Sequence, residues 1–289
     1  MVMWKDLEPD QRLLAVLNQA DRERGSRSTL IATGASHDKN AWSNTFADGC
    51  ARMVAAEFRM RLAGRLTVLP DAGGNAEPPT ITYFERGQPK SKKIDVLVGD
   101  LVAGLQIAVS LKGVGFRDQT SLGFGKNITG RLYELESETR RLHEYRPQAV
   151  VVGLYFVPIG AVEDKRTART PSGFADIVAN VRSITGRIEP QRQDEWHRVD
   201  LGFVGLYVPG DPERFVTRDR DPSKRRPFSY DDPFERGVVR FFDVTADPPR
   251  RGRPPIATTL SLDEVVERVL EQTAPGKAQI DWATPESDE

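Results

Sequence analysis

Apolar residues recur along the chain at two spacings, and these spacings predict its secondary structure. A repeat of three to four residues, typical of amphipathic helices, covers residues 8–24, 45–62, 129–145, 172–184 and 262–272. Short apolar or alternating runs, typical of strands, cover residues 66–69, 80–84, 93–98, 105–112, 149–158, 199–209 and 238–246. Helices and strands that alternate in this way indicate an α/β fold.

The order of these elements is the most informative feature of the predicted topology. The helix over 45–62 is followed by strands joined by short segments such as 87–92 and 99–104, which predict neighbouring and largely antiparallel strands. A helix then leads into 149–158, whose continuous apolar run is typical of a strand buried on both faces. The polar segment 36–44, before the first long helix, is expected to be a loop.

Composition limits the chemistry that these elements can carry. The chain has 289 residues, 41 basic and 42 acidic, and its net charge of -1 does not by itself indicate a nucleic-acid partner. One cysteine, Cys50, and three histidines cannot form a zinc finger or a disulfide framework, so a metal would be held by oxygen. The mean hydropathy of -0.47, the acidic start and the absence of a long apolar run predict a cytoplasmic protein without a membrane partner.

Two neighbouring strands carry polar residues on one face each. Asp95 lies on the face of its strand opposite Ile94 and Val96, and Ser110 and Lys112 share one face of the next strand. If the strands pair, Asp95 and Lys112 meet on a common polar face. A carboxylate there can hold Mg²⁺ while the lysine polarises water beside a phosphodiester; alternatively the two residues form a surface ion pair of little consequence.

A glutamate interrupts the apolar stripe of the helix over 45–62. Cys50, Met53 and Met60 form this stripe, and Glu57 falls in the middle of it. Because an unpaired charge on an apolar face is costly, Glu57 either binds a metal ion or pairs with Arg61 at the rim of the core.

Taken in order, these residues resemble the PD-(D/E)XK nuclease superfamily. In that family a helix with a glutamate precedes a meander of strands, one strand carries an aspartate, the next carries (D/E)xK, and a helix and a buried strand follow. The matching positions are Glu57, Asp95, and Ser110 with Lys112, within residues 44–158. The resemblance implies a restriction-endonuclease-like core of helix, three-strand meander, helix and strand.

Ser110 departs from the family pattern, which has an acid at this position. Some restriction enzymes of the superfamily also have serine there and take the missing carboxylate from the following helix, which here offers Glu134, Glu136 and Glu138. Glu57 could instead supply the second carboxylate unaided.

The same resemblance implies a metal centre. Asp95 would be the principal ligand of Mg²⁺, for which Mn²⁺ would substitute, together with the backbone carbonyl of Leu111, one of the glutamates and waters. Lys112 would orient and polarise the attacking water. A site of this kind is an octahedral oxygen site, in keeping with the lack of cysteine and histidine clusters.

Basic residues after these strands are candidate DNA contacts. The Gly-rich segment that follows Lys112 fails the P-loop pattern at both ends, so we expect no nucleotide cofactor but a mobile loop that offers Arg117 and Lys126 to phosphates, or else a plain solvated loop. Arg131 in the next helix is a further candidate. Arg251 and Arg253 belong to an Arg-Gly-Arg-Pro sequence, which we interpret first as an ordered turn and second as a minor-groove contact.

The patterns divide the chain into four segments. We expect an N-terminal helical arm over 1–40, the nuclease core over 41–210, a C-terminal α+β extension over 211–274 that packs on the core, and an acidic flexible tail over 275–289. Ser261, followed by Glu264, predicts a capping box at the last helix.

The expected function is Mg²⁺-dependent hydrolysis of DNA by a type II-like restriction or phage-defence endonuclease. It would act as a homodimer if it cuts both strands of a symmetric site, with operon-encoded defence proteins as possible partners. The alternative, favoured by Ser110, is a catalytically inactive nuclease-fold module for DNA binding or assembly. A small-molecule enzyme would require a deep, mostly apolar pocket away from Asp95.

Overall fold

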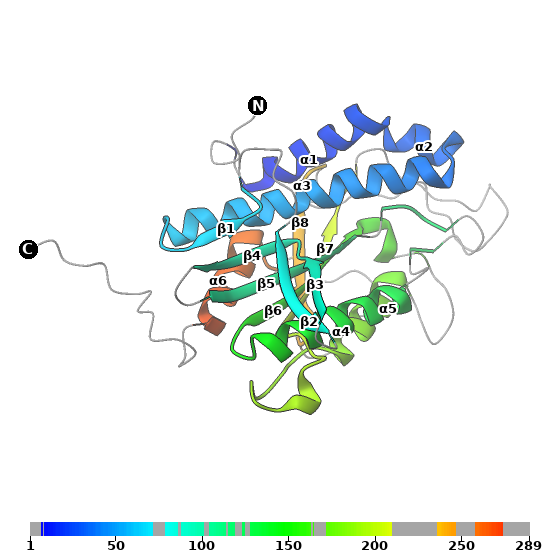
Figure 1. Ribbon diagram of the computed structural model, residues 1–289. Coiled ribbons are helices and arrows are strands. Elements are labelled where there is room, and N and C mark those ends of the chain that lie inside the picture. Colours follow the sequence, from blue (N-terminus) through cyan, green and yellow to red (C-terminus); the bar gives the residue numbers. More distant parts are fainter. Residues whose placement is uncertain are drawn as a thin grey trace, which may run out of the picture.

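A mixed six-stranded sheet forms the centre of the molecule (Figure 1). The computed structural model describes residues 7, 9–71, 79–85, 88–100, 104–113, 115–118, 123–124, 128–162, 164, 172–209, 236–246 and 258–273. In spatial order the strands are β1 (Thr67–Leu69), β4 (Val96–Asp100), β5 (Gly104–Gly113), β6 (Val150–Pro158), β7 (Leu201–Tyr207) and β8 (Val239–Asp243). The β5–β6 and β6–β7 pairs are parallel and the other pairs are antiparallel, so the chain has the expected α/β class.

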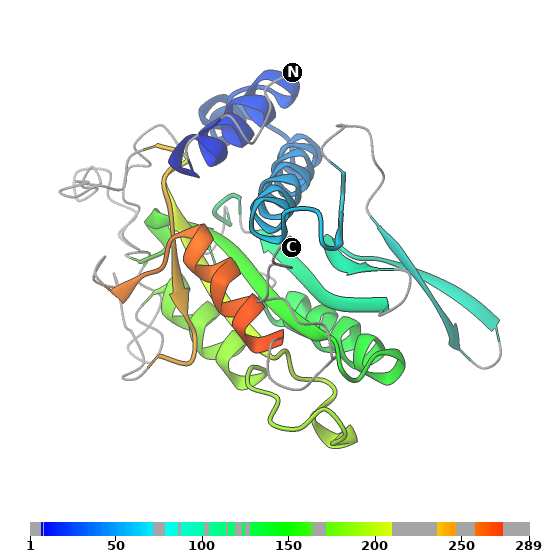
Figure 2. The same cartoon turned by 90° about the vertical axis from the view of Figure 1, so that its left-hand side faces the viewer.

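Helices cover both faces of this sheet and make three layers. On one face lie α1 (Pro9–Arg24), α3 (Ser36–Leu62) and α6 (Leu262–Thr273), and on the other lie α4 (Ile128–Tyr145) and α5 (Gly173–Ser183). Short elements complete the described chain: α2 (Arg27–Thr33), η2 (Ile159–Val162) and η3 (Gln193–Glu195). Figures 1 and 2 show α1 and α3 above the strands and α4 below them. Each face of the sheet therefore has its own apolar core.

The alternation along β5 determines which side chains reach which layer. Ile107, Val109 and Leu111 belong to the core under α3, and Ala108 belongs to the core under α4. Ser110 and Lys112 follow Ala108 at intervals of two, so they share one face of the strand, as the sequence predicts, and in the structure this face lies toward α4. β6 lies between two parallel neighbours and is buried along its whole length, which confirms the strand expected from its continuous apolar run.

The expected order of helix, three strands, helix and strand is present, with an insertion. α3, β1, β4, β5, α4 and β6 follow one another, and a two-stranded hairpin of β2 (Thr80–Glu85) and β3 (Gln88–Lys93) separates β1 from β4. The expectation that 87–92 only joins two strands was wrong, and so was the single strand over 93–98. Lys93 ends β3, and Asp95 lies in a bend before β4. Ile94 consequently packs under α4 while Val96 packs under α3.

The polar segment 36–44 is not a loop but the first turns of α3. Trp42 is fully buried in this segment, stacks on Phe46 with ring centroids 5.3 Å apart, and donates a hydrogen bond from Nε1 to Asp21 Oδ1 at 2.9 Å. The stack within α3 and the hydrogen bond to α1 stabilise the helix where its local sequence is polar. The domain boundary expected at residue 40 consequently falls inside α3.

The C-terminal elements are part of the same layered structure. β8 forms the edge of the sheet beside β7, and Val265, Val266 and Val269 of α6 are buried in the core under α3. The predicted capping box is present in part: the Ser261 backbone N–H donates to Glu264 Oε2 at 2.7 Å, and the Ser261 hydroxyl group donates to the same oxygen at 2.9 Å. The tail over 275–289 and most of the segment 211–236 lie outside the described residues. In the described part, no helix has the length and apolarity needed to cross a membrane.

Candidate functional site

Polar side chains from β5, α4 and the bend before β4 meet on the α4 side of the sheet. The Leu111 backbone N–H donates a hydrogen bond of 2.6 Å to Asp95 Oδ2, which fixes the Asp95 carboxylate against β5. Ser110 Oγ donates to Glu138 Oε2 at 2.7 Å, which holds the α4 glutamate against the same strand. Lys112 lies beside them. The structure therefore brings together the predicted residues Asp95, Ser110, Lys112 and Glu138.

Glu138 is the most highly coordinated of these groups. Lys112 Nζ lies 3.2 Å from its Oε2 and Lys92 Nζ, from β3, lies 3.0 Å from its Oε1. The side chains of Glu138 and Lys112 are 17% and 12% exposed, so these contacts are partly shielded from solvent. One carboxylate thus links the hairpin, the sheet and α4.

The two carboxyl groups have pKa values shifted in opposite directions. Burial raises the pKa of Asp95, and the negative charges of Glu138 and Asp48 raise it further. The hydrogen bond from the Leu111 N–H and the charge of Lys112 lower it, but they do not outweigh burial. Burial also opposes ionisation of Glu138, but Lys112, Ser110 and Lys92 together outweigh it and lower the pKa of Glu138. Two nearby carboxyl groups with divergent proton affinities are typical of functional sites.

A small cavity lies among these groups and a larger one adjoins it. The first has a volume of about 60 Å³ and is lined by Ile81, Lys92, Lys93, Ile94, Asp95, Ser110, Lys112, Glu138, Arg141 and Leu142. The second, of about 380 Å³, shares Ile81 and Leu142 with it and lies between the hairpin, the sheet and the end of α4, where Tyr145 contributes to its wall. The smaller cavity has room for an ion or a few waters, and the larger one has room for part of a ligand.

The donor set suits a hard cation that keeps much of its water. Asp95 and Glu138 offer carboxylate oxygens, and the backbone carbonyl of Leu111 lies between Ser110 and Lys112. Within the residues that the structure describes, no three histidine, cysteine or acidic side chains gather as a metal site. Mg²⁺ is commonly held by one or two carboxylates plus waters, so the pair fits that mode of binding but not a closed protein cage.

Two charged residues near the site were not predicted from the sequence. Lys92 was assigned to a turn, because the polar sequence of an exposed hairpin strand lacks an apolar alternation. Asp48, on α3, lies close enough for its charge to raise the pKa of Asp95. Nothing in the helical pattern distinguishes Asp48 from an ordinary solvent-facing acid.

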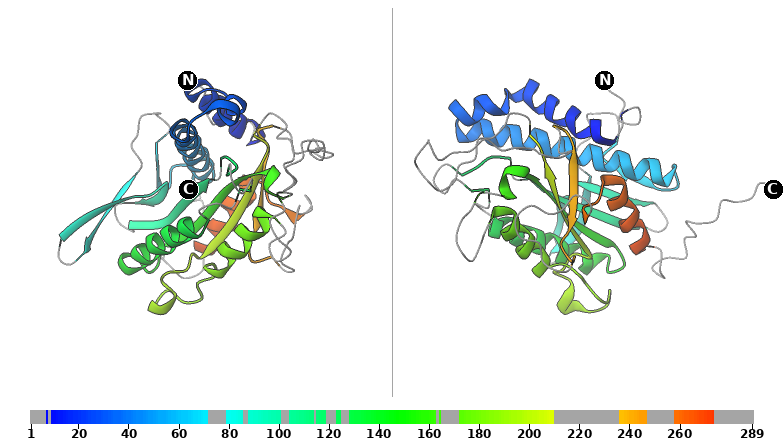
Figure 3. Two further views of the ribbon diagram at one scale, coloured as in Figure 1. Left: turned by 90° about the vertical axis from the view of Figure 1, so that its right-hand side faces the viewer. Right: turned by 180° about the vertical axis from the view of Figure 1, so that it is seen from behind.

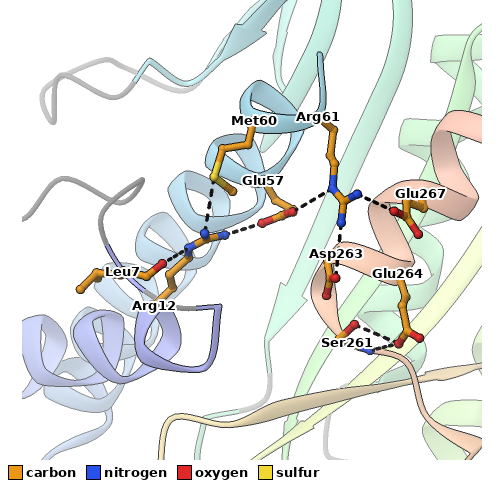
Figure 4. Close-up of polar contacts among 9 residues, drawn as sticks. All are labelled: Leu7, Arg12, Glu57, Met60, Arg61, Ser261, Asp263, Glu264 and Glu267. Atoms are coloured by element: carbon orange, nitrogen blue, oxygen red, sulfur yellow. Dashed lines mark hydrogen bonds and ion pairs between the residues drawn. The ribbon is translucent and has the colours of Figure 1, made fainter. Parts of the chain in front are cut away.

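Glu57 belongs to a different cluster (Figure 4). Its carboxylate is 4% exposed and forms an ion pair with Arg12 of α1, whose side chain is also 4% exposed. Arg61 Nε lies 3.4 Å from Glu57 Oε1, which is the pairing expected as the alternative to metal binding. Arg61 also reaches Asp263 of α6 at 3.3 Å. The structure thus joins Glu57 to α1 and α6, not to the groups around Asp95.

The remaining candidate residues make other contacts or lie outside the described residues. Glu134 is exposed on α4. The Arg117 guanidinium carbon lies over the Phe124 ring, 4.9 Å from its centroid, and Arg131 donates a hydrogen bond to the Gly113 carbonyl. Three further candidate DNA contacts lie outside the described residues: Lys126, Arg251 and Arg253.

A comparison of the chain with protein-family models, with curated proteins and with solved structures gives no match in any of the three.

Proposed function

We propose that this chain is a Mg²⁺-dependent endonuclease with a restriction-endonuclease-like core that hydrolyses DNA phosphodiester bonds in the cytoplasm, as a type II-like restriction or phage-defence enzyme. The observation that carries the proposal is the 2.7 Å hydrogen bond from Ser110 to Glu138. It holds a helix carboxylate beside Lys112 and Asp95, where the acid of the (D/E)xK pattern is missing. The site thus has two carboxylates and a lysine despite Ser110.

Each residue has a distinct part in this mechanism. Asp95 and Glu138, with the Leu111 carbonyl, would hold Mg²⁺, which supplies charge stabilisation at the phosphate when bound. Lys112 lies beside both carboxylates, where its ammonium can orient a water molecule and balance charge on the phosphate. Ser110 keeps Glu138 in position through its hydroxyl group.

Cleavage of plasmid and phage DNA with Mg²⁺ or Mn²⁺ tests the proposal. Asp95→Ala, Lys112→Ala and Glu138→Gln should each reduce the cleavage rate by about 100-fold or more, since each removes a group that acts on the reacting atoms. Glu134→Gln is the matched control: it makes the same change on the same helix at an exposed position, and its rate should equal that of the wild type. Equal rates for Glu138→Gln and Glu134→Gln would contradict the role of Glu138.

A second candidate is a catalytically inactive DNA-binding module, and the contacts of Glu138 favour it. Lys92 and Lys112 already neutralise this carboxylate, so Glu138 needs no cation to balance its charge. In this case no DNA would be cut with either metal, and DNA affinity would be unaffected by Asp95→Ala. A homodimer remains part of the first proposal, since two copies would cut both strands of a symmetric site.

A further inference from the structure

The β2–β3 hairpin forms an arm that extends from the candidate site away from the rest of the molecule (Figures 2 and 3). We call the residues Thr80–Glu85 and Gln88–Lys93 the hairpin arm. Within the described chain its strands pair with each other and not with the six-stranded sheet. A hydrogen bond of 2.8 Å from the Ile94 N–H to the Pro79 carbonyl closes its base. Since a lone two-stranded hairpin is marginally stable in water, an arm of this shape suits a role in which a partner covers it.

The arm is strongly basic. Its two strands contain three lysines and one acid. Lys90 and Lys93 are exposed. Burial raises the pKa of Asp48 on α3, and the charges of Arg52 and Lys93 oppose this rise. The strand alternation puts Lys90 on the face of the arm that carries Lys92, and Lys93 on the opposite face. Both faces of the arm therefore carry positive charge.

The base of the arm is attached to the candidate site. Lys92 contacts Glu138 at 3.0 Å, and the chain passes from Lys93 through Ile94 directly to Asp95. A polyanion bound along the arm would therefore pass close to the small cavity beside Asp95 and Lys112.

We propose that the hairpin arm binds double-stranded DNA by lying in its major groove, with Lys90 and Lys93 against backbone phosphates. This inference rests on the proposed function for its substrate class. The major groove is about 12 Å wide and admits a two-stranded β-ribbon, whose strands lie about 5 Å apart. Lysines on both faces of a ribbon can reach phosphates beside the groove, and Lys92 at the base leads to the candidate site.

The salt dependence of DNA binding tests this arm directly. Binding of a short labelled duplex of mixed sequence is measured by fluorescence anisotropy in EDTA, so that no cleavage is needed. For the double variant Lys90→Gln, Lys93→Gln, the slope of log affinity against log salt should fall by about 1.8, which is about 0.9 for each phosphate contact. Between 50 and 200 mM salt, the wild type should accordingly lose about tenfold more affinity than the variant.

Two control variants separate charge from structure. Lys39→Gln removes one lysine from the start of α3 and should leave the slope unchanged. Lys90→Arg, Lys93→Arg keeps both charges and should retain the wild-type slope. An unchanged slope for the double glutamine variant overturns the inference. Binding of single-stranded DNA through the arm, with no binding of duplex DNA, overturns it as well. Unchanged binding together with self-association of the glutamine variant would assign the lysines to protection of the hairpin edges.

The outcome is independent of catalysis. One outcome is that the wild type and the double glutamine variant cut DNA equally well and show the same slope of log affinity against log salt. The proposed function then stands, and the arm is not a DNA-binding element. A protein that never cuts, yet binds duplex DNA through Lys90 and Lys93, retains the arm and loses the nuclease.

Discussion

At the scale of single residues, Asp95 and Glu138 show how one cluster gives two carboxyl groups different proton affinities. Asp95 receives one backbone hydrogen bond in a setting where burial dominates, whereas Glu138 is surrounded by two ammonium groups and a hydroxyl. The pKa of Asp95 is raised and the pKa of Glu138 is lowered. A cation that binds both would gain most from Asp95, whose charge is otherwise poorly compensated.

These shifts predict opposite effects of neutral substitutions on stability. A carboxyl group with a raised pKa in the folded state destabilises that state at pH above its folded pKa, so Asp95→Asn should raise the melting temperature at pH 7. The gain should disappear as the pH falls below the ordinary aspartate pKa of 3.8. Asparagine Oδ1 can still accept the hydrogen bond from the Leu111 N–H.

The matched variant Glu138→Gln should behave in the opposite way. A group with a lowered pKa stabilises the folded state above its unfolded pKa, so this variant should melt at a lower temperature than the wild type at pH 7. The difference should vanish as the pH falls through the lowered pKa of Glu138. Thermal unfolding at several pH values measures both curves, and shifts of the same sign for the two variants would contradict this account of the cluster.

Local periodicity could predict the part of the site that lies on strand β5. Ser110 and Lys112 share a face because side chains alternate along any strand. Glu138 was one of three acids on the following helix that could supply the missing carboxylate. The sequence could not decide whether Glu57 binds a metal ion or forms an ion pair, since its partner Arg12 lies 45 positions away on α1. Long-range pairing of this kind leaves no trace in the spacing of residues.

At the scale of elements, a chain of ion pairs joins three helices on one side of the sheet (Figure 4). Arg12 of α1 contacts Glu57 of α3, Arg61 of α3 contacts both Glu57 and Asp263, and Asp263 lies at the start of α6. Arg12 Nε also donates to the Leu7 carbonyl at 3.2 Å. These contacts fix α1 and α6 against α3 at a site separate from the candidate catalytic groups.

Loss of the Glu57 carboxylate should therefore affect stability and not catalysis. Glu57→Ala leaves Arg12 buried without its partner, which should lower the free energy of unfolding by about 3–5 kcal/mol. Urea denaturation measures this loss. The cleavage rate per folded molecule should equal that of the wild type, in contrast to Glu138→Gln. The double variant Arg12→Met, Glu57→Leu should recover much of the stability, because it buries no charge.

Elements whose own sequence has a clear apolar pattern were predictable, and elements stabilised by contacts with distant residues were not. β6 and α6 match their expected ranges to within a residue or two, since the first is apolar throughout and the second has a clear apolar stripe and a capping box. β3 was missed because it is rich in lysine and has no apolar alternation. The start of α3 was missed because its anchor to α1 is a contact between Trp42 and Asp21, which lies 21 positions earlier in the chain.

At the scale of the whole molecule, stability is distributed unevenly between the layered core and the hairpin arm. β5, β6 and β7 are central strands with helices over both faces, and their backbone groups pair on both sides. The hairpin arm has one pairing partner per strand and exposed residues on both strands, including Thr82 and Lys90. Opening of the arm therefore requires little apolar surface to be lost, whereas opening of β6 disrupts both cores.

Hydrogen exchange should reveal this gradient and its link to function. Amide protons of β6 should exchange most slowly, those of β5 and β7 next, and those of β2 and β3 much faster, since an isolated hairpin opens with little cost in free energy. A short DNA duplex in EDTA should slow exchange in the hairpin arm while leaving β6 unchanged, because a bound partner stabilises the element that it covers. The double variant Lys90→Gln, Lys93→Gln should show the same gradient without DNA but weaker protection with it. Slow exchange of the arm in the free protein would instead mean that contacts within the chain stabilise the hairpin. The shape of the arm would then be no argument for a bound partner.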